Sequence, residues 1–199
     1  MSLGSVGVYC GSTPGNDPAY LSAADLTGRV LARRGVDVVY GGGRAGLMGA
    51  LADGALAEGG HVVGVIPRDL VDRELAHQGV SELHVVDTMH ERKLLMAERS
   101  DAFLALPGGA GTLEEVAEQW TWTQLTIHDK RSGLLDVHGF WEPLRRMLET
   151  MIEAGFVRES QRGILAFDDD VERLLDRLAE PPDWTDKWGG PLPARPSSA

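Results

Sequence analysis

Residues 101–115 read DAFLALPGGAGTLEE, an apolar run followed by three glycines within five positions and then by a threonine and two glutamates. Apolar runs without strict alternation are typical of parallel strands that are buried on both faces. A glycine-rich turn that leads directly into a helix can present backbone N–H groups to an anion. The stretch therefore predicts a strand, a turn and a helix, and the turn is either a plain tight turn or an anion cradle with a carboxylate at its edge.

The same alternation of strand and helix runs along most of the chain. We predict strands at 5–10, 36–40, 61–66, 83–87, 101–106, 133–137 and 163–167, and helices at 18–34, 45–59, 88–99, 112–126, 140–154 and 168–179. Repeated units of this kind form a parallel sheet covered by helices, which is an α/β fold. We expect one domain over residues 1–180. Residues 181–199 are rich in proline, glycine and serine, and we expect a tail that is ordered only where it docks.

Composition restricts the class of protein. The 199 residues are 43% hydrophobic and 25% charged, as in ordinary globular proteins that bury a single core. A formal net charge of -11 argues against general binding of nucleic acid, whose phosphates are held by many lysines and arginines. No apolar stretch approaches the roughly 20 residues that span a bilayer. The single cysteine, Cys10, cannot form an internal disulfide, and the first residues lack a secretory signal pattern, so we expect a cytoplasmic protein.

Three glycine-bearing loops follow predicted strands, namely 11–15 (GSTPG), 41–49 (GGGRAGLMG) and 107–111 (PGGAG). In an open α/β sheet, ligands bind beyond the carboxyl ends of the strands, which is where these loops lie. None is a Walker A loop, and the spacing of the second does not match the dinucleotide fingerprint. The loops are consistent with phosphate binding by backbone N–H groups.

The segment TLEE (112–115) also fits a capping box, in which Thr112 caps a helix and Glu115 reaches back to it. At 100° per residue, Glu114, Glu115 and Glu118 point away from the face expected to pack on the sheet, so none of them requires burial. That face consists of Leu113, Val116 and Trp120. The pattern leaves Glu115 as either a cap or a carboxylate of the site.

A second possible capping box, Thr88 with Glu91, begins the segment TMHERK (88–93) at the same edge of the sheet. Arg92 and Lys93 then fall near the start of a helix, where the macrodipole disfavours cations. A local rule broken without evident gain indicates either a functional role or surface ion pairing. The six histidines lack the spacing of metal ligands, so we expect no metal site.

Together these motifs resemble the LONELY GUY family of cytokinin riboside 5′-monophosphate phosphoribohydrolases. PGGAGTLEE matches the family pattern PGGxGTxxE, and VYCGS, YGGGRAGLMG, GVIP, MHERK and TWTQLTIHDK follow in the family's order over about residues 5–175. Ala110 departs from the family, which often has an aromatic residue there. Many relatives also carry the label "lysine decarboxylase".

The resemblance implies a Rossmann-like, doubly wound parallel sheet with helices on both faces, and a homodimer. It implies hydrolysis of the N-glycosidic bond of N6-substituted adenosine 5′-monophosphates to a free base and ribose 5-phosphate, without a cofactor or metal. Arg92 and Glu115 match the family's catalytic pair. The positions that match its substrate-binding residues are Gly11, Ser12, Gly42, Gly43, Glu74, Lys93, Gly108, Gly109, Ala110, Gly111, Thr112, Leu113, Glu114 and Thr121.

Three other functions compete with this one. A broader nucleoside-monophosphate nucleosidase would act on AMP itself, and a non-catalytic nucleotide-binding protein would release no base. A lysine decarboxylase would need a Schiff-base lysine and pyridoxal phosphate, and the chain has only Lys93, Lys130 and Lys187. The sequence does not decide how selective the protein is for the N6 substituent.

Overall fold

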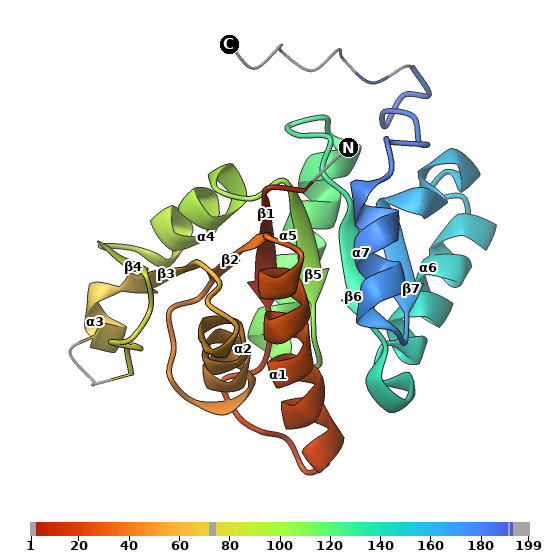
Figure 1. Cartoon of the computed structure of the whole chain (residues 1–199). Coiled ribbons are helices and arrows are strands. Elements are labelled where there is room, and N and C mark those ends of the chain that lie inside the picture. The colour runs from red at the N-terminus through yellow and green to blue at the C-terminus, as the bar shows by residue number, and fades with distance from the viewer. Residues whose placement is uncertain (1–2, 72–74, 191, 193–199) are drawn as a thin grey trace.

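The computed structural model describes residues 3–71, 75–190 and 192, and its centre is a seven-stranded sheet in the order β4-β3-β2-β1-β5-β6-β7 (Figure 1). Every neighbouring pair of strands is parallel. The strands are β1 (Ser5–Tyr9), β2 (Asp37–Tyr40), β3 (Val62–Pro67), β4 (Glu82–Val86), β5 (Ala102–Ala105), β6 (Ser132–Leu135) and β7 (Leu165–Asp168). The predicted α/β fold with a doubly wound parallel sheet is confirmed.

Helices cover both faces of the sheet. Side chains of α1, α2 and α7 pack in one core on the first face, and those of α4, α5 and α6 pack on the second. The helices are α1 (Pro18–Arg33), α2 (Gly46–Ala57), α3 (Arg68–Val71), α4 (Met89–Glu98), α5 (Ala110–Gln124), α6 (Glu142–Glu153) and α7 (Val171–Ala179), with 3-10 turns η1 (Val137–Gly139) and η2 (Glu159–Ile164). The sequence did not predict α3, η1 or η2, because three to six residues carry too little periodicity. None of the described helices is long and apolar enough to cross a membrane.

Two glycines let α1 and α2 approach backbone to backbone. A Cβ atom at Gly28 would lie 2.1 Å from the carbonyl oxygen of Leu51, and one at Gly54 would lie 2.3 Å from that of Asp25. Real Cβ atoms do not approach other atoms so closely, so both positions require glycine in this packing. The contact holds α2 against the sheet, and with it the loop between β2 and α2.

The order of the strands creates one switch point. From β1 the chain winds outward through β2, β3 and β4, and it then returns to the other side of β1 with β5. Strands β1 and β5 are neighbours in the sheet, but the loops that follow them lead to α1 and α5 on opposite faces. Where the two loops begin, the Gly11 N–H donates to the Pro107 carbonyl at 3.1 Å. Ligands of open α/β sheets bind in the crevice at such a point.

Part of the predicted C-terminal tail packs on the domain. Trp184 is 5% exposed and joins the core formed by α5, α6 and η2. The buried Arg131 guanidinium stacks over the Trp184 ring at 5.0 Å and pairs with the carboxylates of Asp183 and Glu180. The described stretch from Pro181 to Gly190 is thus anchored by a buried aromatic ring and an ion-paired arginine.

We expect Trp184→Ala to lower the free energy of unfolding by about 3–5 kcal/mol, since it removes a large buried aromatic side chain. Trp188 is the matched control, because it lies four residues away and is 71% exposed. Trp188→Ala should change the free energy by no more than about 0.5 kcal/mol. Chemical denaturation followed by circular dichroism measures both, and a loss of no more than about 0.5 kcal/mol in Trp184→Ala as well would show that docking of Trp184 adds no stability.

Candidate active site

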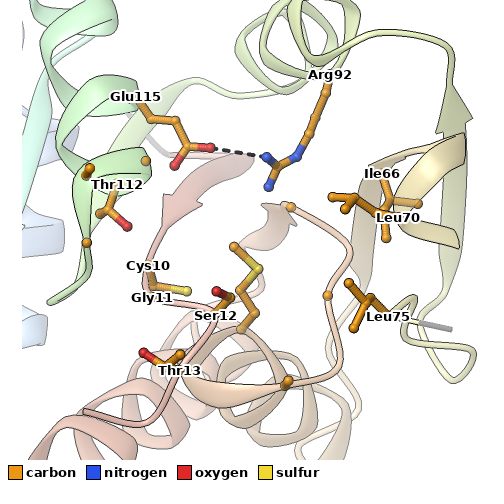
Figure 2. A pocket seen from close by; sticks show the side chains of 17 residues that line it. Cys10, Gly11, Ser12, Thr13, Ile66, Leu70, Leu75, Arg92, Thr112 and Glu115 are labelled. Carbon is orange, nitrogen blue, oxygen red and sulfur yellow. Dashed lines mark ion pairs between the residues drawn. The ribbon is translucent and has the colours of Figure 1, made fainter. Parts of the chain in front are cut away.

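A cavity of about 620 Å³ opens at the switch point (Figure 2). Its walls come from the loops after β1, β2 and β5, from the first turns of α2, α4 and α5, from the end of β3, and from α3 and the chain beyond it. The lining residues are Cys10, Gly11, Ser12, Thr13, Gly41, Gly43, Ala45, Met48, Ile66, Leu70, Leu75, Arg92, Gly109, Ala110, Gly111, Thr112 and Glu115.

Arg92 from α4 and Glu115 from α5 point toward each other across the top of this cavity in Figure 2, with Nη1 and Oε1 3.5 Å apart. Both residues are buried, at 7% and 6% exposed. The Arg92 side chain is further fixed by a hydrogen bond of 3.2 Å from Nε to the Val65 carbonyl. A buried ion pair is costly to desolvate and adds little stability, so its position in a cavity suggests a functional role.

The environment of Glu115 brings its ionisation close to neutral pH. Burial is the largest cause and raises the pKa of Glu115 to about 7, while the positive charge of Arg92 opposes the rise. Such a carboxyl group holds its proton below neutrality and releases it above. A pKa near the working pH suits a group that takes up or gives a proton during a reaction.

Gly41, at the end of β2, makes room for Arg92. A Cβ atom at position 41 would lie 1.8 Å from Nη2 of Arg92, which is inside any allowed contact. The φ angle of Gly41 is not positive, so its backbone does not itself demand glycine. The position is therefore glycine because of the guanidinium beside it, and no sequence pattern separated it from Gly42 and Gly43.

We expect Gly41→Ala to displace the Arg92 guanidinium and to lower kcat/KM of the hydrolysis that the family resemblance implies by about 10- to 100-fold, as small misplacements of catalytic groups do. The atoms nearest to the new methyl group belong to the ends of the Arg92 and Met48 side chains and not to the backbone, so thermal melting should stay near that of the wild type. Steady-state kinetics and a melting curve on the same preparation check both parts. Unchanged activity would show that the position of the guanidinium is unimportant.

Helix α5 begins earlier than predicted, at Ala110 with Gly109 as its N-cap, and no side chain caps it. The predicted capping box of Thr112 and Glu115 is therefore wrong, because both residues already lie inside the helix. The first N–H groups of a helix lack intrahelical partners, and here they lie on the cavity wall. A Cβ atom at Gly109 or Gly111 would meet no described atom within 4 Å, so this end of the helix is open to a ligand.

The second predicted N-cap is confirmed, because the side chain of Thr88 caps α4. Its Oγ1 accepts from the Glu91 N–H at 3.1 Å, and Oε2 of Glu91 accepts from the Asp87 N–H at 3.0 Å. These bonds fix the first turn of α4, the turn that carries Arg92. The cation near the helix start is thus part of a rigid element that faces the cavity.

Two expectations about the faces of α5 need correction. Val116 and Trp120 pack in the core as predicted, whereas Leu113 is 46% exposed. Glu115, expected to need no burial, is buried, because α4 covers that side of the helix. Helical periodicity identified the side that faces the sheet, and it could not show that a second helix lies against the other side.

The structure brings together nine of the residues singled out from the sequence. The cavity is lined by Gly11, Ser12, Gly43, Arg92, Gly109, Ala110, Gly111, Thr112 and Glu115. Six others are absent from its wall, namely Gly42, Lys93, Gly108, Leu113, Glu114 and Thr121. Glu74 lies outside the described residues.

Several of the residues outside the wall have structural partners instead. The Gly42 carbonyl accepts from the His77 N–H at 2.9 Å, which ties the loop after β2 to the chain beyond α3. The Thr121 hydroxyl donates to the Ala117 carbonyl within α5 at 2.8 Å. A Cβ atom at Gly108 would lie 2.1 Å from Oγ1 of Thr112, so this glycine allows the turn to close on the helix.

Eight lining residues were not singled out from the sequence: Cys10, Thr13, Gly41, Ala45, Met48, Ile66, Leu70 and Leu75. Four of them, Thr13, Gly41, Ala45 and Met48, lie in the glycine-bearing loops that the sequence placed at the ligand-binding edge. The rule that sites lie at the carboxyl ends of strands could have indicated Cys10 and Ile66. Leu70 and Leu75 form part of the wall across the cavity from Thr112 and Glu115 (Figure 2), and the sequence carried no signal for them. Burial raises the pKa of the Cys10 thiol well above its usual range, so it does not supply a thiolate.

Glycine loops at the switch point of a doubly wound sheet, with a buried arginine–glutamate pair beside them, define a Rossmann-like protein with a candidate ligand-binding cavity. A family model described as "Possible lysine decarboxylase" matches residues 48–178. The probable cytokinin riboside 5′-monophosphate phosphoribohydrolase LOGL2 of Oryza sativa subsp. japonica is 46% identical over 173 residues, which cover 87% of this chain and 71% of that protein. Cytokinin riboside 5′-monophosphate phosphoribohydrolase LOG1 of Arabidopsis thaliana is 44% identical, with 87% and 81% covered. The chain belongs to the LONELY GUY family, as its motifs predicted.

Solved structures agree on the fold. The X-ray structure of TM1055 aligns with a TM-score of 0.65 at 21% identity, over 86% of this chain and 96% of that one. A molybdenum cofactor carrier protein from Chlamydomonas reinhardtii aligns with a TM-score of 0.65 at 24% identity, over 88% and 98%. At this level of identity the likeness extends to the architecture alone.

Proposed function

We propose that this protein hydrolyses the N-glycosidic bond of N6-substituted adenosine 5′-monophosphates, the cytokinin riboside 5′-monophosphates, to the free base and ribose 5-phosphate. The observation that carries the proposal is the buried pair of Arg92 and Glu115 beside the open N-terminus of α5. The family relatives, at 44–46% identity over most of the chain, bear the name of this activity.

The carboxylate of Glu115 has two tasks in this reaction. Cleavage of the bond between C1′ and N9 builds positive charge on the ribose, and a carboxylate held beside the sugar stabilises that charge. The same group can orient and deprotonate the water whose oxygen bonds to C1′, as a carboxylate does in glycoside hydrolysis. Its pKa of about 7 allows it to accept that proton near neutral pH.

Arg92 acts through its charge and its geometry. Guanidinium groups do not give up a proton in proteins, so the proton that reaches the departing base comes from water or another group. The guanidinium keeps Glu115 oriented and supplies positive charge where electron density moves onto the purine. Its bond to the Val65 carbonyl fixes it before substrate arrives, which is the preorganisation that such stabilisation requires.

The phosphate supplies binding energy away from the bond that breaks. The first N–H groups of α5, at Ala110, Gly111 and Thr112, and the dipole of a 15-residue helix favour an anion at this wall. Binding energy from such a remote group can be used to orient the ribose against Glu115. We therefore expect a nucleotide, and not the nucleoside, to be the substrate.

Incubation with AMP, isopentenyladenosine 5′-monophosphate, GMP and CMP, followed by chromatography of the free bases, tests the proposal. Release of isopentenyladenine well above release of adenine supports it. Similar rates with AMP would establish the broader nucleoside-monophosphate nucleosidase instead. Tight nucleotide binding with no base released from any substrate would establish a non-catalytic nucleotide-binding protein.

The lysines of this chain do not support decarboxylation of lysine. None of the described residues that line the cavity is a lysine. Lys93 is bonded to two glutamates, the Nζ of Lys130 donates to the Ala97 carbonyl at 2.6 Å, and Lys187 belongs to the docked C-terminal segment. A Schiff base needs a lysine amine at the reacting centre.

The pH dependence of the reaction should follow Glu115. We expect kcat/KM to rise with pH up to about 7 and to fall about tenfold per unit below it, because the working form is the carboxylate. A profile of kcat/KM between pH 5 and 9, measured with the four nucleotides named above, checks this. Activity that is flat down to about pH 5 would mean that no group with this pKa controls the reaction.

We also propose that the protein is a cytoplasmic homodimer of about 43 kDa, twice the 21.5 kDa chain. Exposed apolar side chains on the helices that carry the pair, Met89 and Leu94 on α4 and Leu113 on α5, support a second copy at this face. The lone buried Cys10 supports a reducing compartment. Size-exclusion chromatography with light scattering tests the homodimer, and a mass of 21.5 kDa would show that the protein is a monomer.

A further inference from the structure

Lys93 follows Arg92 on α4, yet its ammonium group has partners of its own. Nζ lies 2.6 Å from Oε1 of Glu114 and 3.0 Å from Oε1 of Glu118, both on α5. The Lys93 side chain is 7% exposed and does not line the cavity. We call these three residues the lysine clamp, and its place in the fold differs from the substrate contact that the family resemblance implies.

The clamp and the catalytic pair join the same two helices. Arg92 and Lys93 are consecutive on α4, and Glu114 and Glu115 are consecutive on α5. The two clamp contacts are close, at 2.6 and 3.0 Å, whereas Arg92 and Glu115 are 3.5 Å apart. The shorter bonds therefore hold α4 against α5 at the level of the pair.

Lys93 is the only partner that the described structure gives to Glu118. The Oε2 atom of Glu118 is buried and has no hydrogen-bond partner among the described residues, and Oε1 is bonded to Lys93. Burial opposes the charge of Lys93, but the bonds to Glu114 and Glu118 raise its pKa above the ordinary value. The ammonium group is thus committed to the clamp as a permanent cation.

We propose that Lys93 is a positioning residue, and not a substrate ligand, whose clamp with Glu114 and Glu118 sets the separation and charge balance of the Arg92–Glu115 pair. The proposal rests on the hydrolase function proposed above. It gives Lys93 a positioning role that is distinct from the catalytic role proposed for Arg92.

The charged groups around Glu115 give the proposal a measurable consequence. Arg92 and Lys93 face it from α4 and favour its carboxylate, while Glu114 and Glu118 on its own helix disfavour it. Tyr9 at the end of β1 and Cys10 directly after it also interact with Glu115 electrostatically. Loss of Lys93 leaves three carboxylates with one cation, so it should raise the pKa of Glu115, and loss of the Glu118 charge should lower it.

Kinetics of Lys93→Met and Glu118→Gln against pH test the clamp. For Lys93→Met we expect the acid limb of kcat/KM to move up by about one pH unit, kcat at pH 7 to fall about fivefold, and KM to stay within about twofold. For Glu118→Gln we expect the acid limb of kcat/KM to move to lower pH. Lys93→Arg keeps the cation and should restore much of the wild-type profile. A KM raised tenfold or more in Lys93→Met with an unmoved limb would overturn the proposal in favour of substrate contact.

Glu98→Gln is the matched control, because Glu98 lies on α4, carries the same charge and is exposed. Glu98→Gln should leave the acid limb of kcat/KM at the wild-type pH. Titration of the Glu115 carboxyl carbon by NMR in the same variants needs no turnover. If the wild type releases no base, the proposed function fails, and opposite shifts of this titration in Lys93→Met and Glu118→Gln still support the clamp. If the wild type is active and the titration does not move, the clamp fails alone.

Discussion

Replacement of Glu115 by glutamine should lower kcat for base release by about 100- to 1,000-fold, with KM within about threefold of the wild type. Glutamine keeps the size of the side chain and removes the charge that would stabilise the ribose and accept the proton from water. The residue lies in the cavity wall beside Arg92 and does not cap α5, so the loss cannot be ascribed to a lost helix cap. Quantifying free base by chromatography at pH 8, where the wild-type carboxyl is ionised, gives the clearest comparison.

Stability measurements on Glu115→Gln supply the control. A carboxyl with a raised pKa in the folded state stabilises the fold fully below its unfolded pKa, and that contribution is lost as pH rises through the folded pKa. For Glu115 this window runs from 4.5 to about 7 and corresponds to about 3 kcal/mol. The wild type should therefore lose about that much stability relative to Glu115→Gln between pH 4.5 and 8. A constant difference across this range would show that the group is not perturbed.

Substitution of Arg92 by alanine should also lower kcat/KM by about 100- to 1,000-fold, for two reasons that act together. The transition state loses its fixed cation, and Glu115 loses the main group that favours its ionised form. We therefore expect the remaining activity to rise with pH above 7, where the wild type has levelled off. Steady-state rates between pH 6 and 9.5 measure both the loss and the displaced limb.

Arg99→Ala is the matched control for Arg92, since Arg99 caps the other end of α4 and is exposed. It should keep near wild-type rates, because its pairing with Glu82 lies outside the cavity. Arg92→Lys should fall between the two, because an ammonium group keeps the charge without the planar fork that reaches both Glu115 and the Val65 carbonyl. Full activity in Arg92→Ala would leave Glu115 to act without a cation, and the proposed division of roles would be wrong.

The sheet was predictable from the sequence because each buried parallel strand is a short apolar run. DAFLAL and SVGVYC contain β5 and β1, and the observed strand bounds lie within about two residues of those predicted. The shorter elements were not predictable in this way. Helix α3 spans four residues, Arg68–Val71, yet it supplies Leu70 to the wall of the cavity.

The candidate site was predictable in part for a similar reason. Glycine loops after parallel strands identify the edge of the sheet, and the ordered motifs identify the family. The fate of neighbouring residues was not predictable, because consecutive helical side chains point about 100° apart and meet different surroundings. Arg92 faces the cavity and Lys93 faces α5, although the sequence presents them as one basic pair.

By itself, the sequence of this protein determined the α/β class, the sheet edge that carries the site, the family and the identity of a candidate catalytic pair. These properties are encoded locally, in apolar runs, in turns and in motif order. Only the tertiary structure decided that PGGAGTLEE opens α5 at Ala110 without a side-chain cap, that Glu115 is buried and that its burial raises its pKa to about 7, and that Gly41 makes room for Arg92. Burial, electrostatic environment and close approach depend on segments distant in the chain, so no local pattern records them.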